Sequence, residues 1–275
     1  MNGTKPIRQE PIKKEYLWGT EEWILSYLHE GFEDVPLLVK KICAREALSV
    51  QVHPDDAYAK EHEGSLGKTE MWYVLDCEPG AYLYYGLKHQ ISENEFKKRI
   101  QNGSITEVCK KVYVKKGDVF YIPAGVIHAI GKGITILEVQ QSSNITYRIY
   151  DYQREDANHQ KRELHIRQAS EICGFSPLLQ GHRPMGLCRK KEGYYEMLLV
   201  QCPYFSVYHY LIKSSFHYHP STGFSYIYVV SGTGTLETES EKIPLNPGDS
   251  YFIPEKMKEF YITGNIEIVM SEVAR

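Results

Sequence analysis

The sequence predicts a mainly β protein that consists of two jelly-roll barrels, with a few short helices and no large helical domain. Short apolar segments recur along the 275 residues, and turn residues separate them, which is typical of antiparallel barrels. Several segments of the N-terminal half also resemble segments of the C-terminal half, which indicates an internal repeat. We therefore expect an N-terminal domain over residues 1–170 and a C-terminal domain over residues 171–275.

The N-terminal half begins with extended, proline-interrupted residues as far as Trp18 and Gly19. The next segment, EEWILSYLHEGF, fits a short helix or a strand. LLVKKICAREALSVQVH predicts one or two strands around a turn. MWYVLDC and AYLYYGL predict the two strands of a hairpin, because the Glu78-Pro79-Gly80 sequence between them is a typical turn.

A helix is expected over SENEFKKRIQNG. Ser92 and Glu95 form a capping-box pattern at its start, and Gly103 ends it. Strands are then expected over VCKKVYV, DVFYIP, ITILEVQ and ITYRIYDY, and a second helix over LHIRQASEICGF. From about Tyr194 the C-terminal half predicts strands over YEMLLVQ, FSVYHYLI, SYIYVV, GTLETE, KIPL, DSYFIP and EFYITG.

The composition is that of an ordinary globular protein, with 42% hydrophobic and 24% charged residues. The net charge of -3 provides no basic surface, so we expect no nucleic-acid partner. We expect no membrane span, since no apolar stretch approaches the roughly 18 residues that one needs. The N-terminus has no apolar signal segment and the six cysteines form no CxxC pair. We therefore expect a cytoplasmic protein with reduced, buried thiols, and the sequence specifies no oligomeric state.

Four residues of the N-terminal half predict a metal site. Gln51 and His53 share one face of a strand, Glu70 opens the apolar run MWYVL, and His128 follows a strand punctuated by glycine and proline. A single strand histidine is usually structural, but two imidazoles, a carboxylate and an amide oxygen together suit one divalent metal ion with open positions for water or substrate.

The internal repeat aligns the segment from Gln51 to Pro54 with the segment from His217 to Pro220. The same alignment puts Ser225 at the position of Glu70 and Glu259 at the position of His128. The second copy therefore lacks half of the predicted ligands. We expect His217 and His219 to be exposed or hydrogen-bonded strand histidines, not a second metal site.

The pattern Gly117-x5-Pro123-x-Gly125-x2-His128 resembles the second motif of the cupin superfamily. QVH followed by Glu70 resembles the first cupin motif, with Gln51 in place of the usual first histidine. The resemblance implies that both barrels are of the cupin type and that the second one is degenerate.

The segments LSVQVHPDD, GKTEMWYV, IPAGVIHAI and EVQQSSNITYRIYDYQR together resemble the type I mannose-6-phosphate isomerases in their short bacterial form. The resemblance is strong from Trp18 to Arg167 and weak beyond. It implies a metal-dependent aldose–ketose isomerase that interconverts mannose 6-phosphate and fructose 6-phosphate through an enediol-type proton transfer. It also implies one divalent metal, Zn²⁺, on the four predicted ligands, and a small phosphosugar as the substrate.

The resemblance further implies that Lys68, Glu138 and Arg148 are catalytic and that Ser49, Lys68 and Arg148 bind substrate. From the residues themselves, a hairpin centred near Ser143 would place Glu138 directly opposite Arg148. Other cations that could meet the phosphate, besides Lys68 and Arg148, are Lys110, Lys111 and Arg154.

Two alternative functions remain open from the sequence. One is another metal-cupin enzyme, such as an iron dioxygenase, although such enzymes usually use three nitrogen ligands or two histidines and a carboxylate. The other is a sugar-binding cupin without turnover. The ligand types are compatible with zinc, manganese and cobalt alike.

Overall fold

The computed structural model describes residues 5–156, 158–179, 181–219, 223–257 and 259–273. The chain divides into two compact units. The first unit comprises Lys13–Trp23 and Lys40–His182, and the second comprises Met1–Ile12, Ile24–Val39 and Arg183–Arg275.

This division differs from the predicted one, in which the boundary follows residue 170 and the whole N-terminus belongs to the first domain. The second unit starts at Arg183 and also includes two N-terminal segments. The reason is strand pairing and packing over a long sequence distance. Ile7 pairs with Phe252 in an antiparallel ladder, and the ring of Phe32 packs edge-on against that of Phe252.

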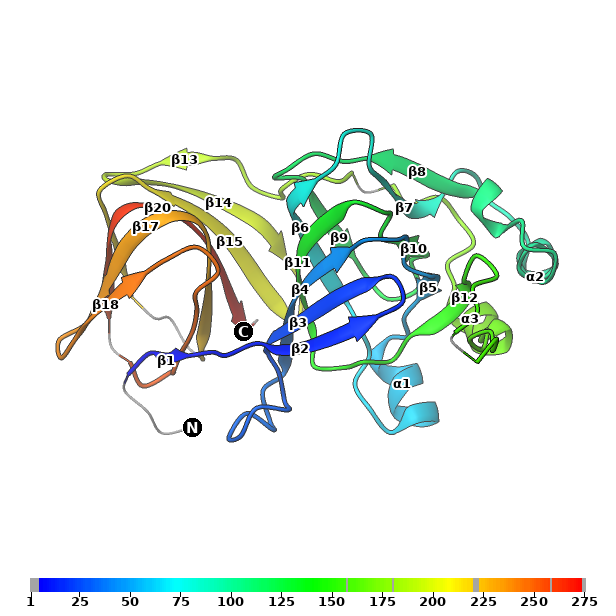
Figure 1. Cartoon of the computed structure of the whole chain (residues 1–275), viewed down its shortest axis with the longest axis horizontal. Helices are drawn as coiled ribbons and strands as arrows, with labels where there is room; N and C mark the ends of the chain where they lie inside the picture. Colours follow the sequence, from blue (N-terminus) through cyan, green and yellow to red (C-terminus); the bar gives the residue numbers. More distant parts are fainter. Residues whose placement is uncertain (1–4, 157, 180, 220–222, 258, 274–275) are drawn as a thin grey trace. The chain divides into compact units, whose positions relative to one another are not determined.

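Two sheets provide most of the strands of the first unit (Figure 1). The six-stranded sheet has the order β2 (Ile12–Tyr16), β3 (Gly19–Leu25), β4 (Leu37–Ala44), β11 (Ile134–Gln141), β6 (Glu70–Cys77) and β9 (Val119–Ile122). The five-stranded sheet has the order β12 (Tyr147–Tyr150), β5 (Val50–Val52), β10 (His128–Ala129), β7 (Tyr82–Leu87) and β8 (Cys109–Tyr113). The segment that fitted a helix or a strand is therefore strand β3 in its first part.

Both predicted hairpins were wrong, although their strands exist. β6 pairs with β11 and β9, whereas β7 pairs with β10 and β8. Likewise, β11 and β12 lie in different sheets, so Glu138 is opposite Trp72 and Arg148 is opposite Gln51. In a jelly roll the chain passes from one sheet to the other after a turn, and alternation of apolar residues does not reveal which sheet receives the next strand.

The described residues contain three α-helices and a short 3₁₀ helix, namely α1 (Asp56–Glu63), α2 (Glu93–Gln101), α3 (Ile166–Ile172) and η1 (Ile105–Glu107). The helices predicted at α2 and α3 are confirmed. The Ser92 hydroxyl accepts a hydrogen bond of 3.1 Å from the backbone amide of Glu95. Helix α1 was missed. The sequence signals for this helix were Asp55 and Gly64. Asp55 caps the helix by accepting a hydrogen bond from the backbone amide of Tyr58, and Gly64 ends the helix with a φ of 63°.

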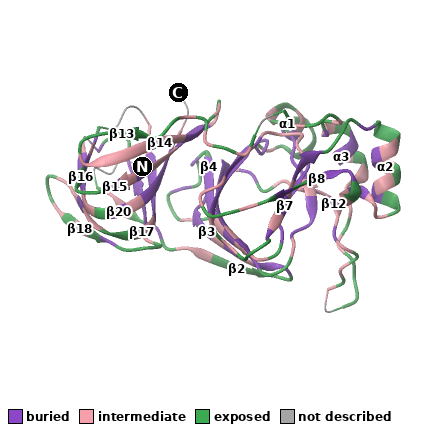
Figure 2. Cartoon of the chain, turned by 90° about the horizontal axis from the view of Figure 1, so that it is seen from above, coloured by how far each residue is buried: buried purple, intermediate pink, exposed green. Residues whose placement is uncertain are grey.

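Alternation along β5 sets the direction of the metal-site side chains. Val50 and Val52 are fully buried in a cluster with Phe96 and Ile100 of α2, whose buried side is visible in Figure 2. Since successive side chains of a strand point to opposite faces, Gln51 projects away from α2, toward the space between the two sheets.

The second unit is a nine-stranded antiparallel sheet. Its path is β1 (Ile7–Arg8), β19 (Ser250–Ile253), β17 (Ser225–Glu237), β20 (Phe260–Val273), β15 (Phe205–Ile212), β14 (Tyr194–Gln201) and β13 (Arg189–Lys190). β16 (Ser215–Tyr218) pairs with β20, and β18 (Lys242–Leu245) pairs with β17. The segments SYIYVV and GTLETE, predicted as two strands, form the single strand β17.

The six cysteines are free, and Cys109 and Cys173 are buried. The expectation that all six thiols are buried was wrong, because Cys188 is exposed and the other three are partly exposed. In the part of the chain that the structure describes, no helix is both long enough and apolar enough to cross a membrane.

Candidate metal centre and active-site pocket

The two sheets of the first unit bring the four predicted metal ligands together. The antiparallel register pairs His128 of β10 with Gln51 of β5, and His53 follows one residue after the end of β5. Glu70 is the first residue of β6 and comes from the other sheet. A site between two sheets is thus assembled from residues that are up to 77 positions apart in the sequence.

The donor atoms have the spacing that a metal ion requires. His53 Nε2 lies 3.1 Å from His128 Nε2, and Glu70 oxygens lie 3.2 Å from His128 Nε2 and 3.6 Å from His53 Nε2. A tetrahedral ion with bonds of about 2.1 Å separates its ligand atoms by about 3.4 Å. The amide Nε2 of Gln51 is 3.4 Å from His128 Nε2, and turning the amide over presents its oxygen instead.

Hydrogen bonds to the backbone orient both imidazoles. His53 Nδ1 lies 2.8 Å from the carbonyl oxygen of Ile145, and His128 Nδ1 lies 2.9 Å from that of Val126. These contacts hold a proton on Nδ1 and leave Nε2 free to bind a metal. Burial lowers the pKa of His128 to about 3 and the pKa of His53 well below its usual value. Both rings are therefore neutral near pH 7, as metal ligands must be.

Glu70 is fully buried, and neither of its carboxylate oxygens has a hydrogen bond of good geometry among the described residues. Lys68 Nζ nevertheless lies 2.7 Å from Glu70 Oε2 and 3.1 Å from His53 Nε2. Burial raises the pKa of Glu70 to about 8, although the Lys68 ammonium opposes this shift. A buried carboxylate with incomplete hydrogen bonding fits a bound cation, so the donor set fits a divalent metal.

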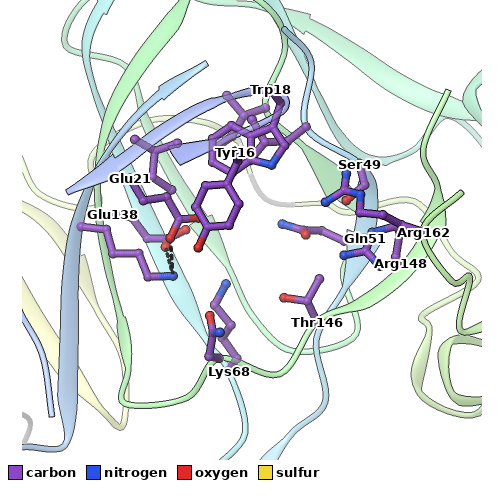
Figure 3. Close-up of a pocket in the computed structure, with 15 residues that line it drawn as sticks. Tyr16, Trp18, Glu21, Ser49, Gln51, Lys68, Glu138, Thr146, Arg148 and Arg162 are labelled. Atoms are coloured by element: carbon purple, nitrogen blue, oxygen red, sulfur yellow. Dashed lines mark ion pairs between the residues drawn. The ribbon is translucent and has the colours of Figure 1, made fainter. Parts of the chain in front are cut away.

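A cavity of about 260 Å³ adjoins this centre (Figure 3). Acidic side chains lie at one side of it and arginines at the other. Its lining comprises Tyr16, Trp18, Glu21, Lys40, Ile42, Leu48, Ser49, Gln51, Lys68, Ile130, Glu138, Asn144, Thr146, Arg148 and Arg162. The structure thus brings all the predicted catalytic and substrate-binding residues, Ser49, Lys68, Glu138 and Arg148, to one pocket.

The acidic side is organised by Lys40, which is 3% exposed. Its Nζ lies 3.5 Å from Glu138 Oε2 and 3.6 Å from Glu21 Oε2, and Trp72 Nε1 donates to Glu138 Oε1 at 2.9 Å. Although burial opposes it, Lys68 and Lys40 lower the pKa of Glu138 to about 2. Lys40 and Glu21 were not predicted as site residues from the sequence. The available signal was a lysine inside the apolar strand LLVKKICA, which must be paired if it is buried.

The basic side contains Arg148 and Arg162. Arg148 Nη1 donates to the carbonyl oxygen of Glu163 at 3.0 Å, while its Nε is buried and has no hydrogen-bond partner within the described ranges. Arg162 donates to both oxygens of Asp151, at 2.7 and 2.6 Å. Although burial opposes it, the hydrogen bonds from Arg162 and Arg154 lower the pKa of Asp151. These contacts fix both guanidinium groups at the pocket wall, and Nε of Arg148 is still available to donate a hydrogen bond.

Three cations considered for the substrate phosphate are not part of the pocket lining. Lys110 and Lys111 are exposed on β8, and Lys111 Nζ lies 3.5 Å above the ring of Tyr82. Arg154 pairs with Asp151. Arg162, which was not among the cations predicted from the sequence, lines the pocket in their place.

Comparison with known proteins adds independent information. A family model described as "Mannose-6-phosphate isomerase, cupin domain" matches residues 195–273. A mannose-6-phosphate isomerase of Streptococcus mutans is 41% identical over 236 residues, which are 86% of this chain and 73% of that protein. ManA, a mannose-6-phosphate isomerase of Bacillus subtilis, is 38% identical over 258 residues, or 94% of this chain and 80% of that protein. The chain belongs to the mannose-6-phosphate isomerase family.

Solved structures of mannose-6-phosphate isomerases have the same fold. The crystal structure of the Bacillus subtilis enzyme superposes with a TM-score of 0.89 at 32% identity, covering 97% of this chain and 99% of that one. A mannose 6-phosphate isomerase bound with zinc and yttrium, 13% identical, matches with a TM-score of 0.71 over 99% of this chain and 100% of that one, which supports the fold alone. The predicted mainly β cupin fold is confirmed for this mannose-6-phosphate isomerase family member.

Proposed function

We propose that this chain interconverts mannose 6-phosphate and fructose 6-phosphate. The observation that carries the proposal is a pocket in which the donor set of His53, Glu70, His128 and Gln51 adjoins Lys68, Glu138 and Arg148. Membership of the mannose-6-phosphate isomerase family supports it. We propose Zn²⁺ as the metal, held by Gln51, His53, Glu70 and His128; one neighbouring structure carries zinc. When bound, this ion supplies a Lewis acid that polarises sugar oxygens.

The reaction moves one proton from C2 to C1 of the open-chain aldose and a second proton from the C2 hydroxyl to the carbonyl oxygen at C1. The C2–H bond breaks as the enediol forms, and the C1–H bond forms as the enediol collapses. No electrons are gained or lost overall, so the pocket must supply proton donors, proton acceptors and charge stabilisation.

Lys68 and Glu138 are the proposed proton-handling side chains. Although burial opposes it, Glu70 raises the pKa of Lys68, so Nζ keeps its proton near pH 7 and can donate a hydrogen bond to a sugar oxygen. Glu138 stays ionised because its pKa is lowered by Lys68 and Lys40. An ammonium and an ionised carboxylate in the same cavity can stabilise a charged enediolate, and the carboxylate can accept a proton from the sugar.

Arg148 and Ser49 are the proposed ligands of the substrate at the basic side. Arg148 has a buried Nε without a hydrogen-bond partner within the described ranges, and Ser49 is 4% exposed yet lines the cavity. We add Arg162 to this set, because its contact with Asp151 holds it at the same wall. Arginine suits the recognition of phosphate oxygens since its guanidinium presents several donors in a fixed plane. The cytoplasmic location stays a prediction.

The experiment compares wild type with His128→Ala in an assay for conversion of mannose 6-phosphate to fructose 6-phosphate, with metal content measured on both. We expect His128→Ala to lose metal and turnover together, because it removes a donor. The matched control is His89→Ala, a change at an exposed histidine of the same unit. Absence of turnover in folded, zinc-loaded wild type would overturn the proposal.

A deuterium experiment tests the enediol step. In deuterated water, mannose 6-phosphate recovered from the reaction is expected to acquire deuterium at C2, because an exchangeable base holds the transferred proton between C2 and C1.

Oxygen uptake by iron-loaded protein, with no isomerisation, would favour the dioxygenase alternative. Binding of the sugar phosphate without turnover would favour the sugar-binding cupin.

A further inference from the structure

The second unit carries a cluster of possible metal ligands that the mannose-6-phosphate isomerase activity does not use. His217, His219 and Glu259 place one donor atom each within 4.8 Å of one another. The Nε2 atom of His217 lies 3.0 Å from Glu259 Oε2, and Nδ1 of His219 lies 3.4 Å from the same oxygen. As the sequence predicted, the two histidines are partly or fully exposed, and His217 is hydrogen-bonded, with Glu259 as its partner.

Strand register explains why the three side chains converge. β16 pairs with β20 so that His217 is opposite Tyr261 and Tyr218 is opposite Phe260. Continuing the register by one step puts His219 opposite Glu259. Residues two apart on each strand share a face, so His217, His219, Glu259 and Tyr261 all project from the same side of this strand pair.

This side is the outer one. Phe216 and Tyr218 belong to the buried core of the second unit, whereas the side chains of His217, His219 and Glu259 are 34%, 68% and 40% exposed. The ring of His217 stacks on that of Tyr261 with centroids 4.0 Å apart and an angle of 9° between the planes. The stacking restricts the rotation of His217, so one ligand is held in place before a metal binds.

The donor distances suit a divalent transition metal. A tetrahedral ion with bonds of about 2.1 Å needs ligand atoms about 3.4 Å apart, close to the 3.0 and 3.4 Å observed. Two imidazoles and one carboxylate favour Zn²⁺ over Mg²⁺ or Ca²⁺, which prefer oxygen ligands. Partial exposure leaves the remaining coordination position to water.

We propose that His217, His219 and Glu259 form a second Zn²⁺ site on the outer face of the second unit. The ion links the end of β16 to the residue that precedes β20. Since the site requires the folded strand pair, Zn²⁺ binds the native state in preference to the unfolded chain and raises the melting temperature. The inference does not depend on the proposed isomerase activity, because none of the three residues lines the catalytic pocket.

The test is a calorimetric titration with Zn²⁺ alone of full-length protein whose first site has been filled with one equivalent of the ion. Wild type is expected to bind one further equivalent. The double variant His217→Asn/His219→Asn is expected to bind that equivalent at least about 100-fold more weakly, since even residues that only support a ligand change affinity by 10- to 100-fold. Its content of the first zinc and its isomerase activity should be those of wild type.

The matched control is His209→Asn, which breaks another His–Glu pair of the same sheet, with Nε2 of His209 2.9 Å from Glu267. This pair is outside the three-residue cluster, so the second equivalent should bind as in wild type. A wild type that takes up only one Zn²⁺, or a folded double variant that binds two as tightly as wild type, would overturn the proposal. Circular dichroism of each variant verifies that the fold is retained.

Discussion

Each of the two units has candidate metal ligands two residues apart on one strand, but that face of the strand is buried in the first unit and partly exposed in the second. In the first unit, Val50 and Val52 face a hydrophobic cluster, so Gln51 and His53 belong to the space between the sheets. The resulting donor set is buried, and its imidazoles stay neutral because burial lowers their pKa values.

In the second unit the alternation is the same: Phe216 and Tyr218 occupy the core, and His217 and His219 lie on the opposite face. In the first unit the other sheet covers that face and contributes Glu70, whereas in the second unit the face is partly exposed to solvent. Donor residues two apart on a strand therefore lie on one side of it, while packing decides whether that side encloses a pocket or meets solvent.

The largest effect is expected from removing the carboxylate of the first unit. Glu70→Gln should weaken Zn²⁺ binding and lower kcat/KM by at least about 100-fold, because the only anionic donor becomes neutral. Metal analysis and steady-state kinetics provide the measurement. Glu259→Gln in the second unit is the counterpart and should leave kcat/KM unchanged. Equal losses of kcat/KM in the two variants would contradict the assignment of the active site to the first unit.

Arg148→Lys should lower kcat/KM by about 100- to 1000-fold, the range observed when one charge-stabilising donor is removed from an active site. Lysine retains the charge but lacks the planar array of donors. The zinc content should be that of wild type, because Arg148 is beside the donor set and not part of it. Arg154→Lys, outside the pocket lining, is the control. A fully active Arg148→Lys enzyme would show that charge alone suffices.

Lys40→Met should destabilise the first unit by about 3–5 kcal/mol, because it leaves the buried carboxylate of Glu138 without one of its two cations. Lys41→Met removes a partly exposed pair with Glu22 and should cost about 0–1 kcal/mol. Urea denaturation of both variants gives the comparison. Equal costs for the two variants would show that Lys40 and Glu138 are not coupled.

The Lys40→Met variant should also change how stability depends on pH. The pKa of Glu138 is lowered in the folded protein from 4.5 to about 2, so its contribution to stability is present above pH 4.5 and is lost as the pH falls toward 2. In Lys40→Met the folded-state pKa rises, and part of this contribution disappears. The loss of stability between pH 5 and 2 should therefore be shallower in the variant than in wild type. Parallel curves would contradict the assigned cause of the shift.

The smallest effect is expected where the two units are alike. Ile136 of the first unit and Ile268 of the second are both fully buried. Ile136→Val and Ile268→Val should each lower the free energy of unfolding by about 0.5–1.5 kcal/mol, since each removes one methylene group from a packed core. Chemical denaturation measures the change. A much larger cost in one unit would reveal a difference in packing that burial alone does not indicate.

Local patterns in the sequence were sufficient for many features of this protein. Alternating apolar residues predicted most strands, and Ser92 predicted the start of α2. The types and spacing of Gln51, His53, Glu70 and His128 predicted a metal site, because metal coordination demands particular atoms from residues that a strand already places on one face.

Tertiary structure alone decided how these pieces meet. The pairing of β6 with β11 instead of β7, the burial of Lys40 between two carboxylates, the position of Arg162 on the pocket wall and the outward face of His217 depend on contacts between segments far apart in the chain. Apolar periodicity indicates which face of a strand is buried. It does not indicate which other strand or sheet packs against that face. The sequence by itself therefore determined the chemistry that is available, and the packing of the strands determined which donors share an enclosed pocket.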